Sequence, residues 1–197
     1  MTFKISFSFT SILFIAFAFS LQAGDPVKFD FSSGELPESW TKPKGDWKAV
    51  DGVLHGDEIE ADEHAAVLSI PAKHKDSEIS FRVRTSGVHM FALSYNHPKG
   101  HLFRVAMSKG TVRVGMDKDK KDPASKAETL QSEKLASKSD EWVTVSCKVT
   151  GDKVEVKCGE VTLNGTHPGL SKPKTGFRFV VKGKGLQIDD IAYTTSG

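Results

Sequence analysis

Arginine is the residue type whose placement in this sequence points most clearly to chemistry. Lysine and arginine together number 27, and only five of them are arginine. Each arginine stands in an alternating run, at a position that points away from the apolar residues beside it. A guanidinium is a planar fork of donors that suits carboxylates, sulfates and sugar hydroxyls, whereas lysine mainly keeps a surface soluble. The five are Arg82, Arg84, Arg104, Arg113 and Arg178.

These arginines support two interpretations. If several of their strands share a sheet, its exposed face carries an arginine-lined surface for an acidic or polyhydroxylated ligand. Alternatively, they pair with Glu78, Glu155 or their neighbours on a solvated face that binds nothing. The sequence leaves both open.

Two histidines form a second candidate. His97 and His101 enclose a predicted hairpin loop, and Tyr95 stands on the strand before it. A metal site would need a third ligand and supporting hydrogen bonds, for which the sequence offers no recognisable residue. We interpret the three as a ligand-contacting loop, with a plain exposed turn as the alternative.

Short alternating runs separated by Gly, Pro, Asn and Asp are expected to position these side chains, because helical periodicity is almost absent. Such runs predict an all-β domain of two stacked antiparallel sheets. The polar, lysine-rich segment 117–140 predicts a solvated loop with a short helix or strand around 127–135. The expected strands are 27–31, 46–50, 52–56, 65–70, 77–85, 88–95, 101–107, 111–116, 142–149, 153–158, 160–164, 175–182 and 186–194.

The first residues predict export. Lys4 is their only charge, an apolar run extends over 5–19, and Ala23 is a small residue at the expected cleavage point. That run is shorter than the roughly 20 residues of a membrane-spanning helix. We therefore expect a signal peptide over 1–23 and a single domain over 24–197, with no membrane span after cleavage. The mature protein is predicted to be a secreted or periplasmic monomer.

Composition excludes several classes of function. Without the signal peptide, 26 basic residues face 25 acidic ones, so a nucleic-acid-binding surface is not expected. The chain also lacks a nucleophile elbow, a phosphate-binding loop and a dinucleotide-binding glycine pattern. Acyl transfer, phosphoryl transfer and hydride transfer therefore lose support.

The two cysteines, Cys147 and Cys158, lie on the arms of a predicted hairpin. A turn centred on Asp152 and Lys153 places them opposite each other, where a disulfide can form, and export permits oxidation. A turn centred one residue earlier places Cys147 against Val156 instead, and two buried thiols are the alternative.

Several segments resemble a known family. The opening contains a W-x-x-x-D-G-x-L unit over 47–54, the segment EWVTVSCKVTGDKVEVKCGEVTLNGTHPG combines a strand-initiating Trp with an L-N-G hairpin, and the last strand contains I-D-D-I. Together they resemble the 3-keto-disaccharide hydrolase domain family over about residues 27–193, a family often related to family 16 glycoside hydrolases. The resemblance implies a concanavalin A-like jelly-roll sandwich. The family usually has an N-S-G-I-[FY]-x-R-like segment after the strand matching EISFRVRT. This chain keeps Ser86-Gly87 there without the following arginine pattern, so no catalytic residue is assigned.

The first and last strands often pair in such sandwiches, which brings Asp30 toward Asp189 and Asp190. Ca²⁺ prefers several oxygen ligands, so these three acids form a candidate structural calcium site. The acidic run Glu58–Glu63 partly matches the E-x-D-x-x-E arrangement of family 16 glycoside hydrolases. We interpret it as a solvated loop, because its spacing differs and it falls between strands.

Three functions remain. The resemblance implies a glycan-active hydrolase working on the concave sheet face. A non-catalytic carbohydrate-binding module, using the arginines and the loops 55–64 and 95–101, is the second, with an oligosaccharide or polysaccharide, including an acidic one, as partner. An envelope interaction domain without a sugar ligand is the third.

Overall fold

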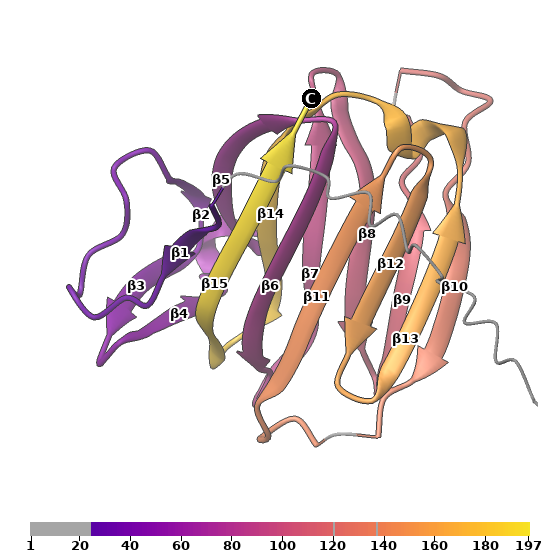
Figure 1. Cartoon of the computed structure of the whole chain (residues 1–197). Helices are drawn as coiled ribbons and strands as arrows, with labels where there is room; N and C mark the ends of the chain where they lie inside the picture. Colours follow the sequence, from indigo (N-terminus) through magenta and orange to yellow (C-terminus); the bar gives the residue numbers. More distant parts are fainter. Residues whose placement is uncertain (1–24, 120, 137) are drawn as a thin grey trace, which may run out of the picture.

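The computed structural model describes residues 25–119, 121–136 and 138–197 as two stacked antiparallel β-sheets (Figure 1). The predicted all-β sandwich is therefore confirmed. The predicted signal peptide over 1–23 lies outside the described residues. Within the part of the chain that is described, no helix is long and apolar enough to cross a membrane.

The eight-stranded sheet lies in front in Figure 1. The first strand pairs with the last, Val27 standing opposite Tyr193, which confirms the pairing expected from the sequence. In spatial order the sheet contains β13 (Val161–Thr166), β12 (Lys153–Cys158), β11 (Val143–Thr150), β6 (Asp76–Arg84), β15 (Leu186–Ser196), β4 (Val53–Asp57) and β3 (Asp46–Val50), with β1 (Val27–Phe29) beside β15.

The seven-stranded sheet lies behind it. Its strands β7 to β10 are neighbours in chain order, but β14 runs between β7 and β5. The order is β10 (Glu128–Lys134), β9 (Thr111–Met116), β8 (Gly100–Ser108), β7 (Val88–His97), β14 (Lys174–Gly183), β5 (Ala66–His74) and β2 (Thr41–Lys44); two short 3₁₀ helices, η1 (Glu60–Asp62) and η2 (Pro168–Ser171), complete the described elements.

Two strands differ from the expectation. The strand β2 was not predicted, since its four residues combine a proline with polar side chains. The strand β10 lies in the segment expected to be a loop, where the sequence left a helix or a strand open. It has few apolar residues and depends on its partners. It pairs with β9, and the backbone N–H of Asn164 on β13 donates to the side-chain oxygen of Gln131 at 2.7 Å. This bond ties the two sheets together at one edge.

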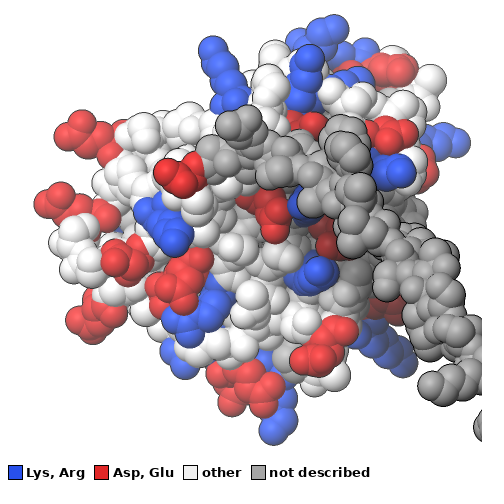
Figure 2. Space-filling model, viewed as in Figure 1, with Lys and Arg blue, Asp and Glu red and all other residues white. Residues whose placement is uncertain are grey.

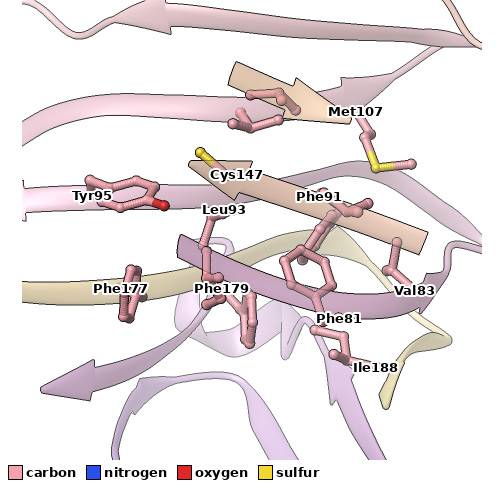
Figure 3. Close-up of a cluster of buried hydrophobic side chains, with 14 of the residues drawn as sticks. Phe81, Val83, Phe91, Leu93, Tyr95, Met107, Cys147, Phe177, Phe179 and Ile188 are labelled. Atoms are coloured by element: carbon pink, nitrogen blue, oxygen red, sulfur yellow. The ribbon is translucent and has the colours of Figure 1, made fainter. Parts of the chain in front are cut away.

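Aromatic side chains from both sheets form the centre of the core (Figure 3). Phe81 of β6 contacts Phe91 and Phe179 of the opposite sheet, with ring centroids 5.8 and 5.1 Å away. Fully burying such a side chain contributes roughly 1.5–3 kcal/mol. Because side chains alternate along a strand, Arg82 and Arg84 on either side of the buried Val83 point outward.

The β11–β12 hairpin adopts the second of the two predicted registers. Cys147 stands opposite Val156, and Cys158 stands opposite Val145. Both cysteines are free, buried thiols, so the disulfide alternative is wrong: in this register the two residues are not opposite each other. Burial raises the pKa of Cys147 to about 12 and that of Cys158 to about 11, which leaves both protonated and unreactive.

Two basic side chains are buried at one end of the sandwich. The Lys174 ammonium donates to the carbonyl oxygens of Lys75, Leu170 and Lys172 at 2.5, 2.5 and 3.1 Å, which fastens η2 to the end of β5. Burial lowers the Lys174 pKa to about 8. His74 stacks on Phe177 with ring centroids 4.9 Å apart, and burial lowers its pKa as well.

We expect acid to destabilise the fold through His74. Since the folded pKa lies below the ordinary value of 6.5, the unfolded chain takes up a proton that the folded chain does not. This contribution is present above the unfolded pKa and is lost as the pH falls below it, by up to about 1.4 kcal/mol per pH unit. Urea unfolding at about pH 5 and about pH 7.5 measures it, and His74→Gln should lose less stability than the wild type between these values. Equal losses in the two proteins would contradict the assignment.

Candidate functional site

The five arginines divide between the two outer faces. Arg82 and Arg84 lie on β6, outside the eight-stranded sheet. The other three lie outside the seven-stranded sheet, on β8, β9 and β14. One continuous arginine-lined face is therefore limited to Arg104, Arg113 and Arg178.

The outer face of the eight-stranded sheet pairs its charges internally. Arg82 contacts Asp189 and Asp190 at 2.6 Å each, and Lys148 contacts Glu78 at 3.2 Å. Arg84 donates to the Gln187 side chain at 2.5 Å. Basic and acidic side chains are interspersed over this side of the molecule (Figure 2). The solvated-face interpretation therefore fits Arg82 and Arg84.

The geometry does not support the predicted calcium site. The carboxylates of Asp189 and Asp190 both bind the Arg82 guanidinium. Asp30 accepts hydrogen bonds from Ser32, and those bonds lower its pKa. Across the described ranges, no group of three or more His, Cys, Asp or Glu side chains is arranged to hold a metal ion. The three acids are therefore used in local structure.

A transverse row of polar residues crosses the outer face of the seven-stranded sheet. Its members stand opposite one another on successive strands, so their side chains leave the same face as near neighbours. The row contains hydroxyls and guanidiniums and no carboxylate. From β2 to β10 it runs Thr41, Ser69, Arg178, Ser94, Arg104, Gly115 and Thr129.

The two arginines of this row have different partners. Arg104 holds Asp117 through two contacts, at 2.7 and 3.1 Å. No carboxylate among the described residues lies within 4 Å of the Arg178 guanidinium. Arg178 instead faces the Asn96 amide, whose oxygen, turned toward it, accepts from Nε, Nη1 and Nη2 at 2.8, 3.0 and 3.2 Å. In this orientation the amide nitrogen donates to Nδ1 of His101 at 3.2 Å. Asn96 thus links two residues that the sequence singled out.

A pocket of about 150 Å³ opens beside Arg178. Polar and apolar residues of β2, β5, β7 and β14 line it. Gly176 forms part of its wall, and a side chain there would collide with the Ile70 carbonyl. The polar lining residues are Ser39, Thr41, Ser69, Asn96, Thr175 and Arg178.

Ser94 occupies the centre of the row, between Arg178 and Arg104. Its side chain is only 2% exposed, and its hydroxyl has no hydrogen-bond partner within the described part of the chain. Ser94 does not line the pocket, so its hydroxyl lies beneath the row and not on its surface.

The assignment of Tyr95 to a ligand site is wrong. Its side chain is fully buried among the core residues (Figure 3). It stacks on Phe103, with ring centroids 4.2 Å apart. Along β7, Tyr95 points to the same side of the sheet as Phe91 and Leu93, whereas Ser94 and Asn96 point to the other side. His97 lies at the exposed end of the β7–β8 hairpin, and Arg113 lies in the middle of β9. Neither residue lines the pocket.

The acidic run 58–63 is a loop with η1 at its centre, as predicted. Its carboxylates have structural partners: Glu58 accepts from the Gly183 amide at 2.8 Å and Asp62 from the Gly45 amide at 2.7 Å. The run therefore supplies no catalytic pair.

Sequence reasoning missed Ser69, Ser94, Asn96 and Asp117. Each is a common residue type without a motif. They can be found from the pairing of the strands, because the order of strands in the sheet places them beside Arg178 or Arg104.

The sequence matches no protein-family model and no curated protein. Its fold, however, is shared with solved structures. The carbohydrate-binding module CBM66 from Bacillus subtilis aligns with a TM-score of 0.58 and 12% identity, covering 80% of this chain and 92% of that one. The Bacillus licheniformis β-glucanase aligns at 0.65 with 6% identity, over 89% of this chain and all of that one.

A prokaryotic β-1,3-1,4-glucanase (lichenase) derived from a mouse hindgut metagenome is similar too, with a TM-score of 0.64, 9% identity and coverage of 88% and 100%. Identities this low establish the fold alone. The protein is a concanavalin A-like jelly-roll sandwich of the kind found in glucanases and carbohydrate-binding modules. The fold implied by the sequence resemblance is therefore confirmed.

We expect the Arg104–Asp117 pair to stabilise the domain. Asp117→Ala should lower the free energy of unfolding by about 1–3 kcal/mol, because it leaves a partly buried guanidinium without its acceptor. A matched control is Glu78→Ala, which breaks the more exposed Lys148 pair and should cost about 0–1 kcal/mol. Chemical denaturation of both variants measures the difference, and similar costs would show that the Arg104 pair has no special structural role.

Proposed function

We propose that this domain binds carbohydrate on the outer face of its seven-stranded sheet, without cleaving it. The row from Thr41 to Thr129 carries the proposal. It offers hydroxyls and guanidiniums at regular lateral spacing, and such groups hydrogen-bond well to the hydroxyls of a sugar chain. The pocket beside Arg178 provides a concave place along this row.

The absence of a carboxylate pair favours binding over hydrolysis. Glycosidases generally need two carboxyl groups about 5–9.5 Å apart on either side of the scissile bond. Neither the central row nor the adjacent one, which contains Val67, Val180, Ala92, Ala106, Arg113 and Ser132, includes an acid. Asp117 beside them is bound to Arg104.

Hydrolysis is the second candidate, because the fold is that of two glucanases and the sequence resembles 3-keto-disaccharide hydrolases. The residues that carry this resemblance are structural: Trp47 and Leu54 are buried in the core. They support the fold and leave the reaction without assigned residues.

We also propose that the domain acts outside the cytoplasm as a monomer, after removal of residues 1–23. The charged, apolar and small-residue order of that segment supports this. The mass of the mature protein should correspond to a chain that begins at Gly24, with a monomeric size by light scattering. An intact N-terminus on the exported protein would contradict cleavage.

Blocking the face tests the function independently of ligand charge. Ser69 and Ser146 are both half-buried serines that point outward from mid-strand, the first beside the pocket and the second on the opposite sheet. Ser69→Trp should abolish glycan binding because the indole fills the pocket, and Ser146→Trp should leave binding unchanged. Glycan arrays and calorimetry measure both, with melting curves as the folding control.

Product analysis of the retained glycans completes the test. Binding without new reducing ends selects the module. Turnover that persists at saturating substrate would make the domain a hydrolase, and retention of no glycan by the wild type would leave the interaction domain as the function.

A further inference from the structure

We propose that Arg178 forms a subsite for an acidic sugar. Its guanidinium recognises the carboxylate of a uronic acid residue. This inference rests on the proposed glycan-binding function and names the chemical class of its ligand. The subsite contains the Arg178 guanidinium, the Asn96 amide and the pocket that both line.

The first observation is a cation without a counter-ion. Among the described residues, Arg82 and Arg104 each hold a carboxylate, whereas Arg84 has the neutral Gln187 oxygen and Arg178 the neutral Asn96 oxygen. Arg178 differs from Arg84 in that it lines the pocket. Burial lowers the Arg178 pKa, which shows that the protein removes water from this guanidinium without offering it an anion. A guanidinium remains charged under such conditions.

The second observation is the pocket of about 150 Å³ beside this guanidinium. Arg178 lines it together with Thr175 of the same strand and Ser69 of β5. An oxyanion that enters the pocket can therefore accept from the guanidinium with hydroxyl groups beside it.

The third observation is the way in which Arg178 is held. Its contacts with Asn96 and the link from Asn96 to His101 fix the orientation of the guanidinium. A fixed planar fork loses little entropy on binding and matches a planar carboxylate through two parallel hydrogen bonds. The fork therefore suits the carboxylate of a uronic acid, and sulfated ligands serve as the comparison in the test.

Neighbouring groups are suited to the rest of the sugar. Ser39, Thr41, Ser69 and Thr175 line the same pocket and can bind ring hydroxyls. In the adjacent row, Val180 is half-buried and adds one apolar side chain beside the polar row. A sugar ring has apolar C–H surfaces as well as hydroxyls, so both kinds of group suit it.

The test compares oligouronates, the same oligosaccharides with their carboxylates reduced to alcohols, and sulfated oligosaccharides. For the wild type, carboxyl reduction should weaken binding about tenfold or more, as expected for the loss of a charge-assisted pair. Arg178→Ala should lose at least the same factor for the oligouronate and should no longer distinguish the native oligouronate from the reduced ligand. Arg178→Lys keeps the charge without the fork and should recover only part of the affinity. Arg82→Ala on the opposite face is the matched control and should change nothing.

The outcomes separate the subsite from the function. Equal binding of native and reduced oligosaccharides, still blocked by Ser69→Trp, would overturn the acidic subsite and leave glycan binding intact. Arg178-dependent binding of the sulfated ligand alone would overturn the uronate in favour of a sulfate. If the wild type binds none of the three, both the subsite and the proposed function are wrong. Calorimetry at two salt concentrations adds a readout, because the Arg178 contribution should weaken as salt rises.

Discussion

Backbone pairing among β5, β14, β7 and β8 is the constraint on which the candidate site depends. Side chains alternate along a strand, so a slip of one residue would turn the guanidiniums into the core and the aromatic rings into water. Phe177 and Phe179 on β14 are buried, which holds Arg178 between them on the outer face. The row is therefore the reverse side of the core. Its lateral spacing is as well determined as the packing beneath it.

The two outer faces treat charge differently. On the eight-stranded sheet, Arg82 lies against two carboxylates, and it shares the Trp142 ring with Arg84, at 5.2 and 5.3 Å. Arg82 is therefore electrostatically satisfied, whereas Arg84 holds the neutral Gln187 oxygen. On the seven-stranded sheet, Arg104 is paired and Arg178 is not. The difference does not follow from the number of arginines, because it arises from what stands opposite each one.

The sequence predicted well to which side of a strand the arginines point, but it did not predict which strands lie side by side. Alternation within a run is local, so the outward direction of Arg104 and Arg178 followed from their apolar neighbours. The same rule, applied to β7, would have placed Tyr95 inward with Phe91 and Leu93; its polar hydroxyl misled the assignment. Which strands lie side by side depends on long-range packing: β14 enters between β7 and β5, and β15 brings Asp189 to Arg82 across 107 positions. The sequence alone therefore could not predict which side chains pair with the arginines.

The two unsatisfied groups of the outer row differ in where they lie. The Ser94 hydroxyl is buried without a hydrogen-bond partner among the described residues. An unpaired buried hydroxyl costs about 1–3 kcal/mol, and alanine, which occupies the same face at position 92, would avoid that cost. This deficit lies beneath the surface, so a ligand does not relieve it. The Arg178 guanidinium, in contrast, lines the pocket without a carboxylate beside it. An anion that enters the pocket therefore supplies what the sheet does not, which is why the proposed ligand site depends on Arg178.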